Sequence, residues 1–350
     1  MATLEELGGW PAVLGPLLAH QSLTAEEAAA ALSEILNGDA TSAQIAALAV
    51  ALRSKGETVE EVTGMVEAML EFAEAVPLDP TLRARLVDTC GTGGDRSHSI
   101  NVSTIAAFVV AGAGAPVCKH GNRAATSAAG SADLLEALGV VIDLGPEGVA
   151  RCVNEAGMGF CFAARFHAAM RHAIPTRREL GVPTVFNFLG PLANPARVRR
   201  QVIGVSDPAM AEKVVGVLQQ RGAVRALVVY GHDGLDELTT ADVSTVIDLS
   251  ADGIRTYLVD PADLGLAPSR RDQLVGGDAA TNAGLARAVL EGEPGPHRDI
   301  VTLNAAAGLI AAGVSHDLEG GLVAARASID DGRAAQVLDD LVRVSKEAPG

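Results

Sequence analysis

The pattern of hydrophobic and polar positions divides the chain near residue 77. Residues 1–76 contain no short β-branched run of the kind that indicates a strand. Three threonines in this region each precede a Glu or Gln by three positions, which is typical of a helix N-terminus; the pairs are Thr24 with Glu27, Thr41 with Gln44, and Thr58 with Glu61. Gly38 and Gly56 stand where helix C-termini favour a left-handed residue. We therefore expect a compact set of helices, followed by a hinge in the sequence PLDPTLRARL.

From residue 85 onward, short β-branched runs alternate with helical segments. The predicted strands are 85–90, 115–119, 159–162, 199–205, 225–231 and 244–249. Helices are predicted at 132–138, 209–222, 281–292, 301–314 and 318–332. Because continuous apolar strands between helices indicate a sheet buried on both faces, we predict an α/β fold with a central, mostly parallel sheet.

One basic segment, FHAAMRHAIPTRRELG at residues 166–181, has a helical pattern interrupted by Pro175. We expect it to pack with the N-terminal helices rather than with the sheet. The predicted helical domain is therefore residues 1–76, joined in space by helices from about 166–190. The predicted α/β domain is residues 80–165 and 195–350.

Composition excludes several classes of protein. The chain has 350 residues, 48% of them hydrophobic, which is enough for one large domain and a smaller one. Its net charge of −16 repels nucleic acid and anionic lipid, and one Trp and two Tyr are too few for a base-stacking platform. The four cysteines show no Cys-x-x-Cys spacing, and neither a secretory leader nor an apolar run of membrane-spanning length is evident. We expect a cytoplasmic protein that binds neither nucleic acid nor membranes.

The basic residues are concentrated in two segments. No acid occurs between Asp95 and Asp133, and Glu179 is the one acid in residues 156–206. The first segment holds Arg96, Lys119 and Arg123, and the second holds Arg165, Arg171, Arg177, Arg178, Arg197, Arg199 and Arg200. This distribution predicts a pocket for a small polyanion, although a chance cluster of surface arginines would look the same.

Two glycine-rich turns follow predicted strands. In the first, Gly91, Gly93 and Gly94 let backbone N–H groups approach an anion at the start of the next helix. The pattern matches neither common nucleotide-binding glycine motif, so an ordinary turn is the alternative. In the second, Lys119 supplies charge, and hydroxyl and amide donors follow at Asn122, Thr126, Ser127 and Ser131. Turns at the ends of neighbouring strands would face one crevice.

A pair of adjacent acids, Asp236 and Glu237, lies in the sequence GHDGLDELTT. Carboxylates beside a phosphate-binding turn are the ligands that Mg²⁺ prefers. The alternative for such a pair in a loop is solvated surface.

Taken together, GTGGD, NVST, KHGNR with SAAGSADLLEALG, FHAAMRHAIPTRRELGVPTVFNFLGPLANP and DGLDELT resemble the anthranilate phosphoribosyltransferase family in order and spacing, from about residue 20 to 345. The resemblance implies transfer of phosphoribose from 5-phosphoribosyl 1-diphosphate (PRPP) to anthranilate in tryptophan biosynthesis. It also implies Mg²⁺ as cofactor, a small helical domain beside a large α/β domain, and a homodimer formed through the helical domain.

The resemblance also assigns residues by position. PRPP would be held by Gly91, Gly94, Asp95, Ser99, Asn101, Val102, Ser103, Thr104, Lys119, His120, Gly121, Asn122, Arg123, Ala124, Ala125, Thr126, Ser127 and Ser131. Mg²⁺ would contact Ser103, Asp236 and Glu237. Anthranilate would be held by Gly91, Asn122 and Arg177, with the Arg177 guanidinium on its carboxylate. We assign no general base, because an aniline nitrogen is neutral at pH 7 and a structural hydrogen bond would explain His120 or His167 equally well.

Several positions depart from the family pattern. Arg96 stands where glycine is usual, Ser99 where threonine is usual, and Ile100 where phenylalanine is usual. Ser99 keeps the hydroxyl, and we expect Arg96 to point to solvent. Ala164 and Ala168 stand where prolines are common in the family. We expect these two changes to affect acceptor selectivity and not the reaction itself.

Two other functions fit parts of the pattern. A pyrimidine nucleoside phosphorylase would share the architecture, but the acid pair and Arg177 argue against it. A catalytically silent relative that binds nucleic acid through its basic segments is disfavoured by the net charge of −16.

Overall fold

The N-terminal region is helical in the computed structural model, which describes residues 2–124 and 128–348. Its helices are α1 (Gly9–Leu18), α2 (Ala25–Asn37), α3 (Ser42–Lys55) and α4 (Val59–Glu71). All three predicted capping boxes form: each threonine side chain accepts from the backbone three residues on, and the Glu or Gln accepts from the threonine backbone N–H. Gly38 and Gly56 follow α2 and α3 with φ of 86° and 88°. The predicted helices and their ends are confirmed.

A mixed sheet forms the centre of the remaining chain, with strand order β1-β4-β5-β6-β7. The strands β1 (Asp88–Gly91), β4 (Arg200–Gly204) and β5 (Arg225–Gly231) are parallel. The strand β6 (Ser244–Ser250) is antiparallel to both of its neighbours, β5 and β7 (Gly253–Val259). A second parallel pair, β2 (Val117–Gly121) with β3 (Met158–Phe162), meets the first sheet through a bridge between Val87 and Val117. All six predicted strands are present.

The edge strand β7 was not predicted. Its side chains are largely exposed, with Ile254 at 44% and Leu258 at 65%, so it lacks the continuous apolar run of a central strand. A local signal was available in the sequence: Ala251 and Asp252 join β6 to β7, and Asp252-Gly253, with φ of 110° at Gly253, is a dipeptide favoured in tight hairpins.

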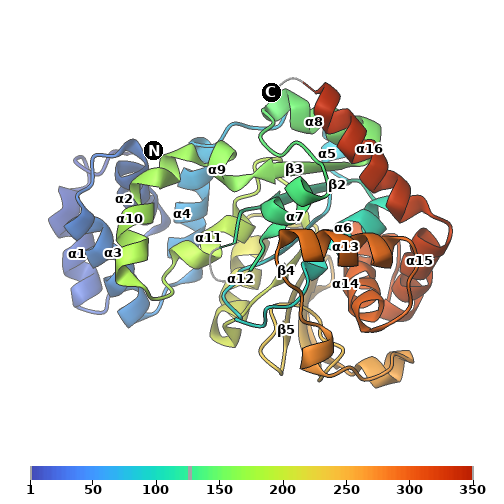
Figure 1. Cartoon of the computed structure of the whole chain (residues 1–350). Coiled ribbons are helices and arrows are strands. Elements are labelled where there is room, and N and C mark those ends of the chain that lie inside the picture. Colours follow the sequence, from blue (N-terminus) through green and yellow to red (C-terminus); the bar gives the residue numbers. More distant parts are fainter. Residues whose placement is uncertain (1, 125–127, 349–350) are drawn as a thin grey trace.

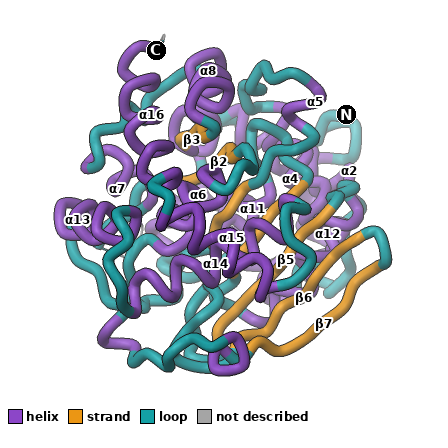
Figure 2. The backbone as a smooth tube through the Cα atoms, turned by 90° about the vertical axis from the view of Figure 1, so that its right-hand side faces the viewer, coloured by secondary structure: helices purple, strands orange, loops and turns teal. Residues whose placement is uncertain are grey.

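Helices cover both faces of the sheet. Alternate strand residues belong to opposite cores: Val202 packs with α14 residues such as Leu303, whereas its neighbour Ile203 packs with α12 residues such as Val214. Burial on both faces, as predicted, follows from this alternation. The further helices around the sheet are α5 (Pro80–Arg83), α6 (Val102–Gly112), α7 (Ser131–Ala137), α8 (Pro146–Ala156), α12 (Pro208–Gln220), α13 (Ala279–Leu290), α14 (Pro296–Ala312), α15 (Leu318–Asp330) and α16 (Arg333–Glu347), with short turns η2 (Pro261–Leu264) and η3 (Arg271–Gln273) (Figure 2).

The basic segment forms shorter elements than predicted: α9 (Ala163–Phe166), η1 (Ala168–His172), α10 (Ile174–Leu180) and then α11 (Phe186–Leu192). The chain breaks before α10 because Pro175 occupies the first turn of that helix, where its missing N–H costs no hydrogen bond. Contacts join η1 to α2 and α10 to α3, and Figure 1 shows α10 alongside the N-terminal helices. These contacts support the predicted grouping of this segment with the helical domain.

None of the helices in the described residues has the length and apolar character needed to cross a membrane.

Candidate active site

A cavity of about 330 Å³ lies where β1, β2 and the start of α6 meet. It is lined by most of the predicted residues, namely Gly91, Gly94, Asp95, Ser99, Asn101, Val102, Ser103, Thr104, Lys119, His120, Gly121, Asn122, Arg123, Ala124, Ser131, Asp236 and Glu237. Ala125, Thr126 and Ser127 lie outside the described residues. The two glycine-rich turns and the acid pair therefore share one crevice at the carboxyl ends of parallel strands, where open α/β sheets bind ligands.

The first turn is shaped by a carboxylate. Gly93 and Gly94 have φ of 68° and 85°, and the Gly93 N–H donates to Asp236 Oδ2 at 2.7 Å. Gly91 has an ordinary φ, but a methyl group there would overlap Asp236 Oδ2. Gly91 is thus required by close approach of an acid 145 positions later, a reason that its sequence context does not reveal.

Arg96 adopts a left-handed backbone conformation of the kind that glycine favours. The φ of Arg96 is 55° and that of His98 is 54°. Residues other than glycine disfavour such left-handed values. The Arg96 side chain is exposed and does not line the cavity, whereas His98 does.

The acid pair is buried, so the solvated-surface alternative is wrong. Asp236 is 9% exposed and Glu237 is 8% exposed. Burial and then the charge of Asp95 raise the pKa of Asp236 to about 7, and burial and then Asp236 raise the pKa of Glu237 to about 8. Asp236 and Glu237, whose pKa values are raised, face one cavity together with Asp95, and a cation there would stabilise their charged forms.

The oxygen ligands at Asp236 and Glu237 suit an Mg²⁺ ion that is bound together with a phosphate. The Ser103 N–H donates to Glu237 Oε1 at 3.1 Å, and the second carboxylate oxygen of Glu237 takes no part in this hydrogen bond. Among the described residues no set of three His, Cys, Asp or Glu side chains forms a complete metal site. Two carboxylates suit Mg²⁺, since this ion commonly takes one or two protein carboxylates and fills its shell with water and substrate phosphate.

Lys119 lies beneath the first turn. Its side chain is almost fully buried, and Nζ donates to the Thr89 carbonyl and, at 3.4 Å, to Ser103 Oγ. Its charge also lowers the pKa of Glu237, against the larger effect of burial. Lys119 therefore supplies positive charge from the cavity floor.

Arg177 does not line this cavity. It lies on α10, half-buried, with its guanidinium carbon 5.6 Å from the centre of the Phe186 ring, and Asn187 beside Phe186 does line the cavity. Burial lowers the pKa of Arg177, and among the described residues it makes no ion pair with a carboxylate. A desolvated cation without a carboxylate partner is suited to a carboxylate ligand.

His120 and His167 form a neutral pair at the edge of the site. Their ring centres are 5.0 Å apart; His120 Nδ1 lies 2.9 Å from the Gly190 carbonyl and His167 Nε2 lies 2.9 Å from the Ala193 carbonyl. Burial lowers the pKa of His120 to about 3 and that of His167 to about 4. Each ring donates a hydrogen bond to a backbone carbonyl, as expected if the two histidines have a structural role.

Comparison with known proteins identifies the family. A family model described as the helical bundle domain of a glycosyl transferase family matches residues 11–73, and one described as the a/b domain of that family matches residues 83–335. An anthranilate phosphoribosyltransferase of Chloroflexus aggregans is 52% identical over 335 residues, covering 95% of this chain and 97% of the relative. One of Salinispora arenicola is 52% identical over 341 residues, covering 96% of each. The chain belongs to the anthranilate phosphoribosyltransferase family.

Solved structures of this family have the same fold. The enzyme from Thermus thermophilus is 41% identical with a TM-score of 0.90, covering 95% of this chain and 99% of that one. A Saccharomyces cerevisiae enzyme in complex with PRPP and Mg is 27% identical with a TM-score of 0.88, and another in complex with 4-fluoroanthranilate is 25% identical with a TM-score of 0.87; each comparison covers 97% of this chain and 98% of the other. The predicted fold class, a small N-terminal helical domain with a large α/β domain, is thereby confirmed.

The sequence did not lead us to predict several polar residues around the active-site cavity. Thr92, Ser97, His98 and Asn187 line it. Behind it, the buried Asn304 accepts from the Leu238 N–H at 2.9 Å and donates to the Leu238 carbonyl at 2.8 Å, fixing the chain just after the acid pair. An amide in the apolar run TLNAAAGLI was the available signal, because a buried polar side chain needs partners.

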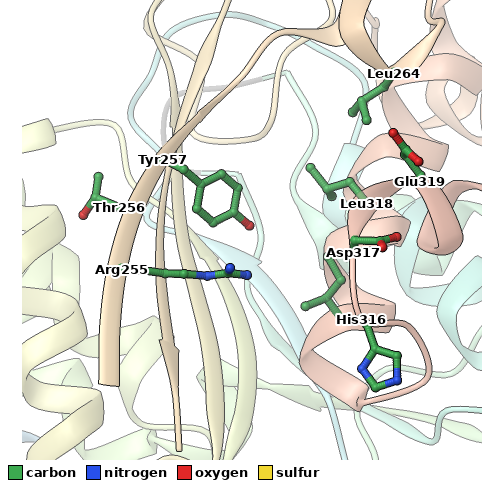
Figure 3. Close-up of a pocket in the computed structure, with 9 residues that line it drawn as sticks. Arg255, Thr256, Tyr257, Leu264, His316, Asp317, Leu318 and Glu319 are labelled. Atoms are coloured by element: carbon green, nitrogen blue, oxygen red, sulfur yellow. The ribbon is translucent and has the colours of Figure 1, made fainter. Parts of the chain in front are cut away.

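A larger cavity, of about 430 Å³, lies between β7 and the start of α15 (Figure 3). None of the predicted site residues lines it. Arg255, which Figure 3 shows beside Tyr257, donates to the buried carboxylate of Asp248. The cavity that holds the acid pair is therefore the candidate active site.

Proposed function

We propose that this protein transfers the 5-phosphoribosyl group of PRPP to the amine of anthranilate, giving N-(5-phosphoribosyl)anthranilate and diphosphate, in tryptophan biosynthesis. The observation that carries the proposal is the single cavity formed by the glycine turn, the N-terminus of α6 and the buried Asp236 and Glu237. A helix N-terminus and backbone N–H groups favour the phosphates, and the acids favour the divalent ion that accompanies diphosphate.

In this proposal the two turns hold PRPP, through the residues from Gly91 to Thr104 and from Lys119 to Ser131 that the sequence predicts. Ser103, Asp236 and Glu237 hold Mg²⁺, which when bound neutralises charge on the leaving diphosphate. Lys119 contributes fixed positive charge beneath the turn, since it is already buried and pays no further desolvation on binding.

The acceptor side is proposed to involve Asn122, the backbone near Gly91 and Arg177. In the reaction the bond from ribose C1 to the diphosphate oxygen breaks, a bond from C1 to the anthranilate nitrogen forms, and that nitrogen then releases one proton. Because that nitrogen carries a free lone pair at pH 7, orientation matters more than proton removal. The Arg177 guanidinium suits the carboxylate of anthranilate, and its position next to the cavity wall supports this role.

Assaying the purified protein with PRPP, Mg²⁺ and anthranilate tests the proposal, by loss of anthranilate fluorescence and release of diphosphate. The double variant Asp236→Ala, Glu237→Ala should lose turnover and require more Mg²⁺. Phosphorolysis of thymidine or uridine without Mg²⁺, in place of anthranilate consumption, would instead establish the nucleoside phosphorylase alternative. Salt-sensitive DNA binding in a gel-shift assay, without turnover, would establish the nucleic-acid-binding one.

The proposed assembly is a homodimer formed through the helical domain. Packed helices α1 and α3 each expose a large apolar side chain, Leu18 at 76% and Val50 at 47%. Sedimentation analysis of the wild type and of Leu18→Asp tests this, with a shift toward monomer expected for the variant. The cytoplasm is the proposed location, and the four free, buried cysteines agree with a reducing compartment.

A further inference from the structure

Two loops that line the active-site cavity are linked by a relay of amides. The Gly277 N–H donates to Asn282 Oδ1 at 2.7 Å, and Asn282 Nδ2 donates to Asn101 Oδ1 at 3.0 Å. Asn101 Nδ2 in turn donates to the Ala129 carbonyl at 2.9 Å. Asn101 and Ala129 line the cavity, one from each loop, whereas Asn282 stands behind them.

The direction of every bond in the relay is fixed by its two ends. A backbone N–H can only donate, so Gly277 must face the oxygen of Asn282; a carbonyl can only accept, so Ala129 must face the nitrogen of Asn101. With both ends fixed, the Asn282 nitrogen meets the Asn101 oxygen. Either amide turned over would place two donors or two acceptors together.

The starting point of the relay is rigid. Asn282 is 2% exposed and lies in the first turns of α13, which Asp278 caps by accepting from the Thr281 N–H at 2.8 Å. Gly276 packs so closely that a methyl group there would overlap Asn282 Oδ1. Asn282 is therefore held before it contacts Asn101.

The same stretch of chain also holds the loop that precedes α6. The Ile100 N–H donates to the Leu274 carbonyl at 3.1 Å, and the Gly276 N–H donates to the His98 carbonyl at 2.9 Å. Asn101 follows directly at the position before α6, where an Asn side chain usually accepts from the first helical turn. It makes no such capping bond, because its amide is committed to Asn282 and Ala129.

We infer that Asn282 is a positioning residue for the proposed phosphoribosyl transfer, acting through Asn101 to hold the loop before α6 in register with the loop at Ala129. The inference rests on the proposed function, since both loops are proposed to hold PRPP. Asn282 does not touch the substrate. It sets the geometry of groups that do, and so its effect falls on PRPP rather than on anthranilate.

The deciding variant is Asn282→Asp, which keeps the acceptor for Gly277 but loses the donor to Asn101. If Asn282 only supported its own turn, this variant would behave as wild type. If it orients Asn101, the Kd of PRPP with Mg²⁺ by calorimetry and the KM for PRPP should both rise about tenfold, as expected for loss of one buried hydrogen bond next to a ligand. The KM for anthranilate should change less than twofold.

A double-mutant cycle shows whether the effect passes through Asn101. In an Asn101→Ala background, Asn282→Asp should change the Kd of PRPP less than twofold, because the partner is already absent. An undiminished effect in that background, or wild-type PRPP binding by the single variant, would overturn the inference. Wild-type protein that binds no PRPP would instead overturn the proposed function.

Controls separate positioning from folding. Ser328→Ala removes another buried hydrogen bond to α6, the one to the Val109 carbonyl far from the cavity, and should lower the melting temperature without changing the KM for PRPP. If Asn282→Asp does not fold, Asn282→Ser removes the same donor without adding charge and carries the same expectation.

Discussion

Gly91 and Asp236 meet because the end of β1 and the loop that follows β5 lie at the same edge of the sheet. Only the hydrogen of a glycine fits between the two residues. Gly91→Ala should push the Asp236 carboxylate away and break its 2.7 Å bond from the Gly93 N–H. Loss of a hydrogen bond to a charged group costs about 1.5–3 kcal/mol, so kcat/KM should fall about 10- to 100-fold in the fluorescence assay.

The matched control is Gly284→Ala on α13, where no atom lies near the added methyl group. This variant should keep wild-type kinetics. Wild-type activity of Gly91→Ala would mean that the position of Asp236 is not important for turnover.

Arg177 is expected to act on the acceptor alone. Arg177→Ala should weaken use of anthranilate by about 2–4 kcal/mol, because a charge-assisted pair with the carboxylate is lost, and should leave the Kd of PRPP unchanged. Steady-state kinetics with each substrate varied in turn measure the split. An unchanged KM for anthranilate would remove Arg177 from the acceptor site.

At the scale of elements, the helical domain depends on the close crossing of α2 and α4. Gly64 of α4 lies against the backbone of Ala25, and a methyl group there would overlap the Ala25 carbonyl. Gly64→Ala should therefore force the helices apart and lower the free energy of unfolding by about 1–3 kcal/mol.

The chain offers a local probe for this crossing. Trp10 on α1, the one tryptophan in the sequence, reports on the helical domain by fluorescence during urea unfolding. Gly284→Ala again serves as control and should be neutral or stabilising, by up to about 1 kcal/mol, since alanine favours a helix interior. Unfolding of Gly64→Ala at the wild-type urea midpoint would contradict the expected strain.

For the whole molecule, the His120–His167 pair links stability to pH. His120 lies on β2, and His167 lies in the segment that leads to α10. Burial depresses both pKa values in the folded state, to about 3 and about 4, below the unfolded value of about 6.5. The unfolded chain then binds more protons below pH 6.5, so stability is complete above that pH and declines as the pH falls.

Between pH 6.5 and 5 the expected loss is about 2 kcal/mol for each histidine. His167→Gln keeps a donor for the Ala193 carbonyl but cannot be protonated, so its stability should fall less over this range. Urea unfolding followed by circular dichroism at pH 5 and 7.5 measures the difference. The exposed His316→Gln is the control, and equal pH dependence in all three proteins would exclude the pair as its source.

The sequence by itself determined the features that rest on short-range contacts or on a repeated motif. Capping boxes such as Thr24 with Glu27 are complete within four residues, and a central strand such as β5, RALVVYG, contains its own apolar run. For the same reason the glycine turn and the acid pair were recognisable, and most of the residues that the family resemblance assigns line one cavity.

Only the tertiary structure decided which distant groups meet. Gly91 needs Asp236, Asn101 needs Asn282, and Arg177 stands beside Phe186 rather than in the cavity wall. The edge strand β7 was also decided by packing, because an exposed strand carries little hydrophobic pattern of its own. Hydrogen bonds and close contacts depend on positions to within a few tenths of an ångström, and groups more than a hundred residues apart reach such positions only once the chain is folded.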